Sequence, residues 1–253
     1  MNEREHEQLC TLMEVAGKIL IFTGAGISTN SGIPDFRGPG GVWTRRKPVF
    51  YQDFMRSGKA RVEYWEYKLE AWDDFKNASP NAVHQGIVKL EKAGKIHKVI
   101  TQNIDGLHQK ARTSRALLVE LHGTNAEVEC QKCLLRSEPE THFGYFRSTG
   151  KPPLCLCGGF LKLATISFGQ NLHPEDIQDA ENAAGQADLV VALGSSLSVY
   201  PAASVPLLAT RRGVPYIIIN RGKTEHDGDP TVTLRLEGDV SDIFPSAVES
   251  ILS

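Results

Sequence analysis

Two segments in the second half of the chain are almost continuously apolar. They read ADLVVAL at residues 187–193 and PYIIIN at residues 215–220. Strands of this kind are typical of a parallel sheet covered on both faces, because neither side of the strand meets water. Helical patterns lie at 175–185 and 201–212, and shorter strand-like runs occur at 18–23, 98–101 and 117–121. This alternation predicts an α/β fold built on a doubly wound parallel sheet.

The region between the first two strands predicts helices. An aromatic stretch contains Tyr64, Trp65, Tyr67, Leu69 and Trp72. Aromatic side chains this dense are more often core than ligand contacts. The pair Ser79-Pro80 predicts the capped start of a helix that runs to about Ala93.

A glycine turn, Gly24-Ala25-Gly26, follows the strand at 18–23, which a helix at 3–16 precedes. Glycines at such a turn let the backbone approach a pyrophosphate, and a helix N-terminus beyond them favours the anion. Thr29 occupies the third glycine position of the usual dinucleotide fingerprint. A simple strand-to-helix turn is therefore the alternative interpretation.

Two polar loops strengthen the nucleotide interpretation. The run GAGISTNSGIPDFRGPGGVW at 24–43 carries Phe36, which could shield a reactive carbon, and Arg37, which could pair with phosphate. The run TQNIDGLHQKA at 101–111 follows a strand end, where doubly wound folds bind ligands. Its Asp105 and backbone groups could hold a carboxamide ring such as nicotinamide, although Asp105 capping the next helix is the alternative.

The histidine at His122 directly follows the strand at 117–121. Histidine titrates near neutral pH and can take a proton from a hydroxyl. The chain has eight histidines, so any one of them has a low prior of being catalytic. Its place at the carboxyl end of a strand favours His122 as the general base.

Four of the five cysteines, Cys130, Cys133, Cys155 and Cys157, cluster within residues 125–160. This segment interrupts the α/β alternation and has little apolar periodicity, so we expect an inserted module that lacks a core of its own. Two local pairs of thiolates suit a tetrahedral structural zinc, which would replace that core. Free thiols or disulfides are the alternatives.

Composition and charge exclude several classes of protein. The net charge of -2 at pH 7 gives no footprint for nucleic acid or an anionic membrane. The polar, acidic start MNEREHEQLC does not resemble a targeting segment, and no apolar run approaches the ~20 residues that span a bilayer. We therefore expect a cytoplasmic protein.

Taken together, these runs closely resemble the sirtuin family, and the resemblance continues through SFGQ at 167–170 and GSSLSVYP at 194–201. It implies a Rossmann-like NAD-binding domain (1–37, 79–124 and 161–253) and a small domain formed by the zinc module at 125–160 and a helical insertion at 38–78. Cys155-x-Cys157 departs from the family, which often carries a C-x-x-C pair there.

The resemblance also implies the contacts of both substrates. Those expected to bind NAD, besides the catalytic residues His122 and Asn103, are Gly24, Ala25, Gly26, Ser28, Ile33, Phe36, Arg37, Gln102, Ile104, Asp105, Gly194, Ser195, Ser196, Asn220, Arg221 and Val240. An acyl-lysine peptide is expected to lie as an extended strand between Phe168, Gly169 and Gln170 on one side and Leu197, Ser198 and Val199 on the other.

The reaction implied is NAD-dependent removal of acetyl or other acyl groups from protein lysine. It yields nicotinamide, O-acyl-ADP-ribose and free lysine. Trp65-x-x-Lys68 stands where desuccinylating sirtuins carry Tyr-x-x-Arg, and lysine lacks the fork that pairs with a carboxylate. The sequence therefore predicts that acidic acyl groups are less favoured than acetyl or longer apolar chains. Rival functions are protein mono-ADP-ribosylation, hydride transfer and nucleotide sensing without catalysis.

Overall fold

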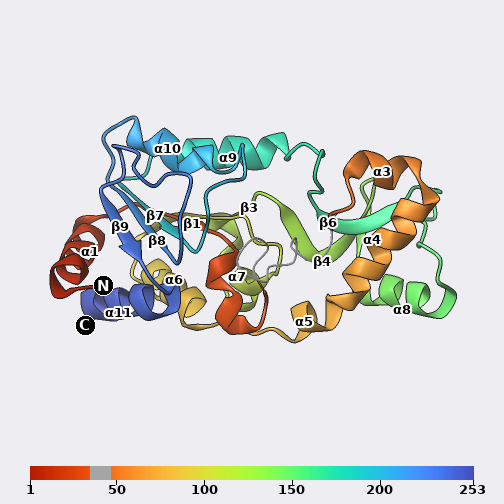
Figure 1. The fold of residues 1–253 in the computed structure, drawn as a ribbon, viewed down its shortest axis with the longest axis horizontal. Helices are drawn as coiled ribbons and strands as arrows, with labels where there is room; N and C mark the ends of the chain where they lie inside the picture. The colour runs from red at the N-terminus through yellow and green to blue at the C-terminus, as the bar shows by residue number, and fades with distance from the viewer. Residues whose placement is uncertain (35–46) are drawn as a thin grey trace.

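The computed structural model describes residues 1–34 and 47–253 and contains a six-stranded parallel sheet (Figure 1). The strand order in this large sheet is β3-β2-β1-β7-β8-β9. The bounds are β1 (Ile19–Thr23), β2 (Ile96–Thr101), β3 (Leu118–Glu120), β7 (Leu189–Leu193), β8 (Tyr216–Asn220) and β9 (Leu234–Glu237). The chain builds outward from β1 to β3 and then returns to add β7 on the other side of β1. The predicted doubly wound fold is confirmed, with its switch point between β1 and β7.

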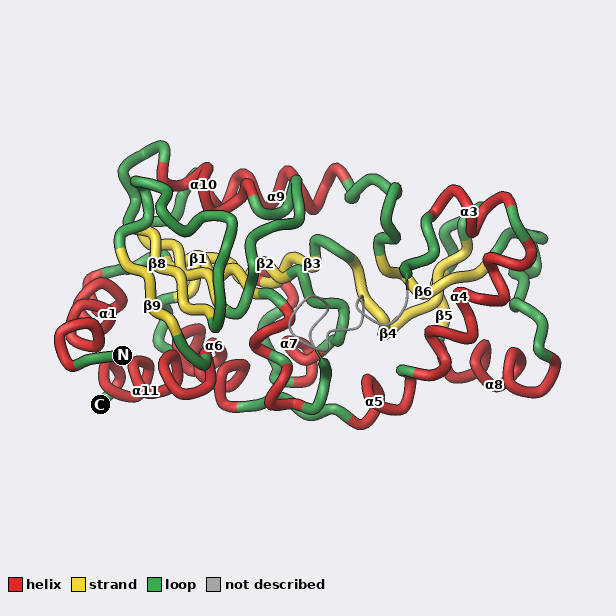
Figure 2. Tube along the Cα trace, viewed as in Figure 1, coloured by secondary structure: helices red, strands yellow, loops and turns green. Residues whose placement is uncertain are grey.

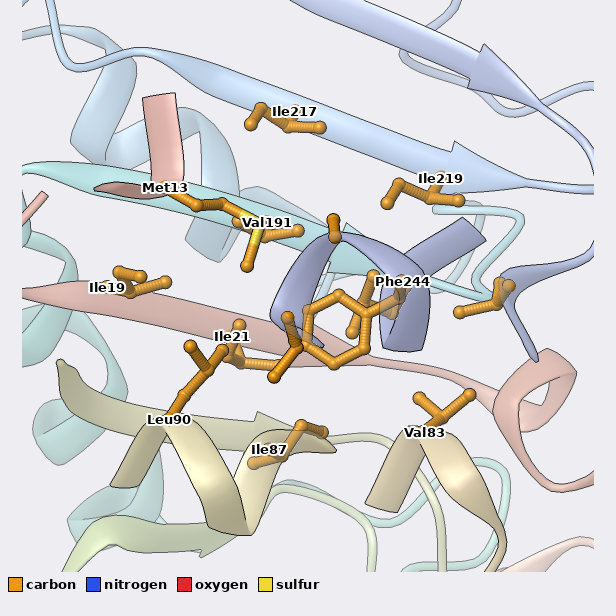
Figure 3. Packing of buried hydrophobic residues seen from close by; sticks show 14 of the residues in the cluster. Met13, Ile19, Ile21, Val83, Ile87, Leu90, Val191, Ile217, Ile219 and Phe244 are labelled. Carbon is orange, nitrogen blue, oxygen red and sulfur yellow. The ribbon is translucent and has the colours of Figure 1, made fainter. Parts of the chain in front are cut away.

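Helices cover both faces of the large sheet. On one face lie α1 (Glu3–Val15), α6 (Ala82–Lys92) and α11 (Val240–Leu252), and on the other α9 (Pro174–Ala184) and α10 (Ser204–Thr210). Strand β1 shows why its sequence is apolar throughout: Ile19 and Ile21 pack in one core, whereas Leu20 and Phe22 pack in the other. Figure 3 shows Phe244 of α11 beside Ile21 in the first of these cores.

A smaller antiparallel sheet lies beyond β3 (Figure 2). It has the order β5-β4-β6, with β4 (Gly123–Cys130), β5 (Arg136–Ser137) and β6 (Leu161–Thr165). The other helices within the described residues are η1 (Ala25–Ile27), η2 (Thr29–Ser31), α3 (Tyr51–Arg56), α4 (Gly58–Glu70), α5 (Trp72–Asn77), α7 (Leu107–Lys110), η3 (Arg115–Leu117) and α8 (Pro139–Thr149).

The expectation that the cysteine module lacks a core is wrong. Phe143 and Phe146 of α8 and strand residues of the small sheet pack against the aromatic helices that precede it in the chain. Trp65 of α4 is fully buried there, and its indole N–H donates to the carbonyl of Leu161 at 3.1 Å. The core is shared between two distant segments, which is why neither segment shows it alone. The prediction that the aromatic stretch is core is confirmed for Tyr64, Trp65 and Trp72, whereas Tyr67 is only partly buried.

Other boundaries differ from the sequence prediction. Helix α6 starts later than expected because Asn81, not Ser79, caps it: the Asn81 side chain accepts from the N–H of Val83 at 3.0 Å. Strand β9 and helix α11 were not predicted from sequence. In the described part of the chain, no helix is long and apolar enough to cross a membrane.

Candidate active site

A cavity of about 1040 Å³ opens at the switch point of the large sheet and extends to the small sheet. Its size is at the upper end of small-molecule sites, so it has room for more than one ligand. The predicted residues that line it are Gly24, Ala25, Gly26, Gln102, Asn103, Ile104, His122, Phe168, Gly169, Gln170, Gly194, Ser195, Ser196, Val199, Asn220, Arg221 and Val240. Loops from opposite ends of the sequence thus meet in one wall.

The glycines of the β1 turn touch the loop that follows β7. The N–H of Gly24 donates to the carbonyl of Leu193 at 3.0 Å, and that of Gly26 to the carbonyl of Gly194 at 2.8 Å. A Cβ atom on Gly26 would lie 2.8 Å from the Cα of Gly194. Gly194 itself has a φ of 61°, which a side chain rarely adopts. These glycines are needed for the close approach of two loops, in addition to any approach to a ligand.

Behind the cavity wall lies a buried polar layer. The carboxylate of Asp105 accepts from the Ser28 hydroxyl at 2.7 Å and from the N–H of Leu107 at 2.9 Å. The Asn103 amide donates to the same hydroxyl at 3.2 Å. Burial raises the pKa of Asp105, although its hydrogen bonds oppose that shift. Asp105 therefore has both of its predicted roles. It caps α7 by accepting a hydrogen bond from the first N–H of that helix, and it orients Ser28, which in turn accepts from Asn103.

Three residues expected to contact NAD do not line the cavity wall. Ser28 and Asp105 belong to the buried layer just described, and Ile33 packs with Ala78 and Leu107 in a small apolar cluster. Phe36 and Arg37 lie outside the described residues.

His122 is held by the backbone of the neighbouring loop. Its Nδ1 lies 3.0 Å from the carbonyl oxygen of Gln102, which can only accept, so Nδ1 carries the proton. In the neutral ring, Nε2 is then the basic nitrogen. The Gln102 side chain donates to the Ser195 hydroxyl at 2.7 Å and thereby ties the β2 loop to the β7 loop. One residue thus orients His122 and links two walls of the cavity.

At the far end of the cavity, a helix N-terminus and a cation lie together. Helix α11 begins at Val240, and the carboxylate of its cap Asp239 accepts from the N–H of Ser241 at 2.9 Å. The exposed Arg221 forms an ion pair with Asp239 at 2.8 Å. Asn220, one residue earlier, braces this turn, because its amide donates to the carbonyls of Arg221 and Gly222 at 3.0 Å each.

The two segments expected to bind the peptide differ in how many of their residues line the cavity. The carbonyls of Phe168 and Gly169 already accept from the Tyr51 N–H at 2.9 Å and the Gln52 amide at 2.8 Å. Leu197 is fully buried in the core beneath α9 and α10, so its side chain does not reach the cavity. Ser198 does not line the cavity either. Its hydroxyl forms a hydrogen bond with that of Ser196 at 2.9 Å. Val199 is the residue of this second segment that lines the cavity.

The four clustered cysteines converge as the spacing predicts. All four sulfur atoms lie within 4.8 Å of one another, with Cys130 and Cys157 at 3.5 Å and Cys133 and Cys155 at 3.7 Å. A tetrahedral zinc with bonds of ~2.3 Å requires sulfur atoms about 3.8 Å apart, so the donor set fits zinc. Burial raises the pKa of Cys130, but N–H groups of Cys133 and Lys132 outweigh this and lower it to about 6. The Cys155-x-Cys157 pair thus brings its sulfur atoms to the same cluster that a C-x-x-C pair would complete.

Sequence reasoning identified only Lys68 in one wall of the cavity, by comparison with the family's acyl-specificity position. Tyr64, Tyr67 and Lys68 of α4 line it, together with Thr165 and Ile166 at the end of β6. The aromatic helix was assigned to the core as a whole, whereas one side of it faces the cavity. The lysine among aromatic residues was the available signal.

These features are those of a nucleotide-binding α/β enzyme with a metal-stabilised module. The cavity lies at the switch point between close-packed glycine loops, a histidine is held by the backbone, and four cysteine sulfur atoms cluster together. The chain belongs to the Sir2 family, whose profile matches residues 24–201. The recognised resemblance is thereby confirmed.

Relatives of known name and structure support this membership over nearly the whole chain. The NAD-dependent protein deacetylase of Rhodopseudomonas palustris is 42% identical over 230 residues, which cover 90% of this chain and 91% of that protein. The enzyme of the same name from Sulfurisphaera tokodaii is 37% identical and covers 98% and 97%. A solved Sir2 complex with a p53 peptide and NAD+ is 34% identical, covers 96% and 97%, and superposes with a TM-score of 0.86.

Proposed function

We propose that this enzyme removes acetyl and related acyl groups from protein lysine, with NAD as its co-substrate. The observation that carries the proposal is the position of His122, whose ring lines the cavity between the dinucleotide loops and the small sheet. The relatives named NAD-dependent protein deacetylase support the reaction. So does a second solved Sir2 complex, 36% identical with a TM-score of 0.88, which holds a deacetylated p53 peptide and 3'-O-acetyl ADP-ribose.

His122 acts as the general base. Its protonated Nδ1 is fixed by the Gln102 carbonyl, which directs the basic Nε2 to a ribose hydroxyl. The hydroxyl oxygen can then attack the carbon of the activated acyl group. Before this step the acyl oxygen bonds to the ribose carbon from which nicotinamide leaves, and afterwards water adds to that acyl carbon as its C–N bond breaks, so that free lysine and O-acyl-ADP-ribose are released.

The polar layer of Ser28, Asn103 and Asp105 positions the nicotinamide end of NAD. The hydrogen bonds at 2.7 and 3.2 Å, from Ser28 to Asp105 and from Asn103 to Ser28, fix the Asn103 amide. Gly24, Ala25, Gly26, Gln102 and Ile104 would line the phosphates and the adjoining ribose, and the adenosine end would lie against Ser195, Asn220, Arg221 and Val240. The acyl-lysine would enter past Phe168, Gln170 and Val199.

The cysteine module has a supporting role. Cys130, Cys133, Cys155 and Cys157 would hold a zinc ion that stabilises the fold, since four sulfur ligands leave no open position for a substrate. We propose that this module and the 38–78 insertion form a small domain on the Rossmann-like one (1–37, 79–124 and 161–253). Their shared aromatic core supports the grouping of these two segments, but it also contains Leu161 and Leu163 of β6, which belongs to the small sheet, so we extend the small domain to residue 165.

The alternative of protein mono-ADP-ribosylation would use the same NAD site, but the deacetylase relatives and the acetyl-ADP-ribose complex do not favour it. Hydride transfer and sensing without catalysis are disfavoured by the same relatives.

The test is an NAD-dependent assay on acyl-lysine peptides, with products identified by mass. We expect O-acyl-ADP-ribose and free lysine. His122→Ala should lower kcat by about 10²- to 10⁴-fold because it removes the base. His6→Ala on α1, far from the cavity, is the matched control. Turnover by His122→Ala within twofold of the parent enzyme contradicts the assigned role of His122, and ADP-ribosylated peptide as the main product contradicts the reaction.

A further inference from the structure

Two buried histidines lie behind the cavity wall, and the proposed reaction does not use them. His84 of α6 is 0% exposed and His108 of α7 is 2% exposed, and neither ring lines the cavity. Their ring centroids are 5.1 Å apart, with an angle of 63° between the ring planes. Burial lowers the pKa of His84 to about 4 and that of His108 to about 3, so both rings are neutral near pH 7 and each carries a single N–H. The position of that proton decides which nitrogen of each ring donates.

His108 begins a chain of hydrogen bonds that ends at the backbone of Asn103. Its Nε2 lies 3.1 Å from Oγ1 of Thr23, the last residue of β1, and the Thr23 hydroxyl donates to Oγ1 of Thr101 at 2.8 Å. The Thr101 oxygen also accepts from the N–H of Asn103 at 3.0 Å. Both threonines are almost fully buried, so water does not compete for these hydrogen bonds.

His84 determines where the proton of His108 lies. The N–H of Asn81 donates to Nδ1 of His84 at 3.4 Å in a capping box, and the Asn81 side-chain oxygen, 3.1 Å from the same nitrogen, already accepts from the N–H of Val83. The proton of His84 is therefore on Nε2. Among the residues that the structure describes, neither this Nε2 nor Nδ1 of His108 has a hydrogen-bond partner. A donor on one ring complements a bare nitrogen on the other, whereas two buried N–H groups would both stay unpaired, so His108 carries its proton on Nε2.

The other end of the histidine pair is tied to the glycine turn. The Asn81 amide donates to the carbonyl of Ile27 at 2.7 Å and to the Ser31 hydroxyl at 3.0 Å. Both acceptors lie in η1 and η2, the segment that directly follows the turn. Ser28 in the same segment accepts from the Asn103 side chain at 3.2 Å. The two histidines thus lie between the two loops whose contact sets the position of Asn103.

We propose that His108 is a positioning residue for Asn103, which it orients through the hydroxyls of Thr23 and Thr101, and that His84 keeps the proton of His108 on Nε2. This rests on the proposed deacylase function, in which Asn103 holds the nicotinamide end of NAD. His108 itself touches neither substrate. Its N–H holds the Thr23 hydroxyl toward Thr101, so that the Thr101 oxygen stays aligned with the Asn103 N–H. Without this N–H the Thr23 hydroxyl can turn away, and the Asn103 loop can shift.

The test compares kcat and the KM for the peptide on one acetyl-lysine peptide in two variants of His108. His108→Leu removes the N–H, whereas His108→Gln places an amide N–H at about the same reach as Nε2. We expect kcat to fall about 10- to 100-fold in His108→Leu, because a displacement of the order of 1 Å can cost about 10²-fold in rate. The KM for the peptide should stay unchanged, and His108→Gln should restore most of the lost kcat.

Two further sets of variants separate positioning from packing. Thr23→Val removes the next hydroxyl and Thr23→Ser keeps it, so Thr23→Val alone should lower kcat; this pair carries the test if His108→Leu does not fold. Adding His108→Leu to Thr23→Val should cost little more, because both changes break the same chain. His226→Leu is the matched control. This histidine is 2% exposed and its Nδ1 lies 3.0 Å from the Tyr216 hydroxyl, so its loss should lower Tm and leave kcat unchanged.

Nitrogen-15 NMR of the histidine rings locates the proton directly, and we expect it on Nε2 of His108. A proton on Nδ1 overturns the proposal. A kcat of His108→Leu within twofold of the parent enzyme also overturns it, and so does an equal loss of kcat in His108→Leu and His108→Gln, which assigns His108 a packing role. Absence of turnover on every acyl peptide contradicts the proposed function itself, and the NMR result then still decides whether the hydrogen-bond chain is correct.

Discussion

Replacing Gly194 with alanine tests whether the two glycine loops must touch for NAD to bind. The φ of Gly194 is 61°, and a Cβ atom there would lie 2.6 Å from the N of Ile27 and 2.7 Å from the C of Gly26. Left-handed backbone costs a residue with a Cβ about 1–2 kcal/mol, and overpacking adds about 1–3 kcal/mol. We expect Gly194→Ala to lose about 2–5 kcal/mol, or about 5–15 °C in Tm.

Function should fall with stability, because the loops must separate before the methyl group fits. A displacement of the order of 1 Å can cost about 10²-fold in rate, so kcat/KM for NAD should drop by about 10- to 100-fold. Thermal unfolding and NAD-dependence of deacylation measure the two effects. Gly150→Ala is the control: its φ is 65°, but nothing lies within 4 Å of the added Cβ. Equal losses of stability in both variants, with kcat/KM for NAD unchanged in Gly194→Ala, refute the close-approach argument.

Two further predictions concern the metal and the buried histidines. A chelator that removes zinc should unfold the cysteine module and abolish activity, because structural zinc contributes on the order of 10 kcal/mol; a protein that retains activity after stoichiometric zinc loss contradicts this. Burial lowers the pKa of His84 to about 4 and of His108 to about 3, from 6.5. The unfolded chain therefore binds more protons than the folded one between pH 6.5 and 4, and stability present above that window is lost as the pH falls. Urea unfolding should show that the free energy of unfolding falls as the pH is lowered across this range. His108→Gln should reduce the slope of that free energy against pH by up to about 1.4 kcal/mol per pH unit. A slope that is unchanged in His108→Gln refutes the assignment.

The large sheet could be predicted because its central strands are buried on both faces. β1, β7 and β8 are apolar at nearly every position, which leaves a strong signal. Strand β9, at the edge, reads Leu-Arg-Leu-Glu and buries alternate residues, so its short pattern was not recognised. The cap of α6 was misplaced because Ser79 and Asn81 are both good caps, and only the contacts of Asn81 with Ile27 and Ser31 distinguish them.

The candidate site could be predicted where residues follow strand ends. His122 and Asn103 are examples, since the topology of a doubly wound sheet brings such positions together. Whether a loop residue is buried in the core or lines the cavity could not be predicted in the same way. The sequence does not tell that Ile33 and Leu197 are core residues, because this depends on which side of a loop meets a distant segment.

The order of the strands in the chain differs from their order in the sheet. β1 precedes β2 and β7 in the chain, but it lies between them in the sheet. Helix α1 packs on α11, and both chain ends lie side by side (Figure 1). Contacts that join distant parts of a chain form late, because long loops must close first. Until β2 and β7 pair with it, β1 has two unpaired edges, and an unpaired strand edge can pair with another chain. The segment Glu3–Thr23 therefore depends for its final contacts on elements that follow it at long distance in the chain.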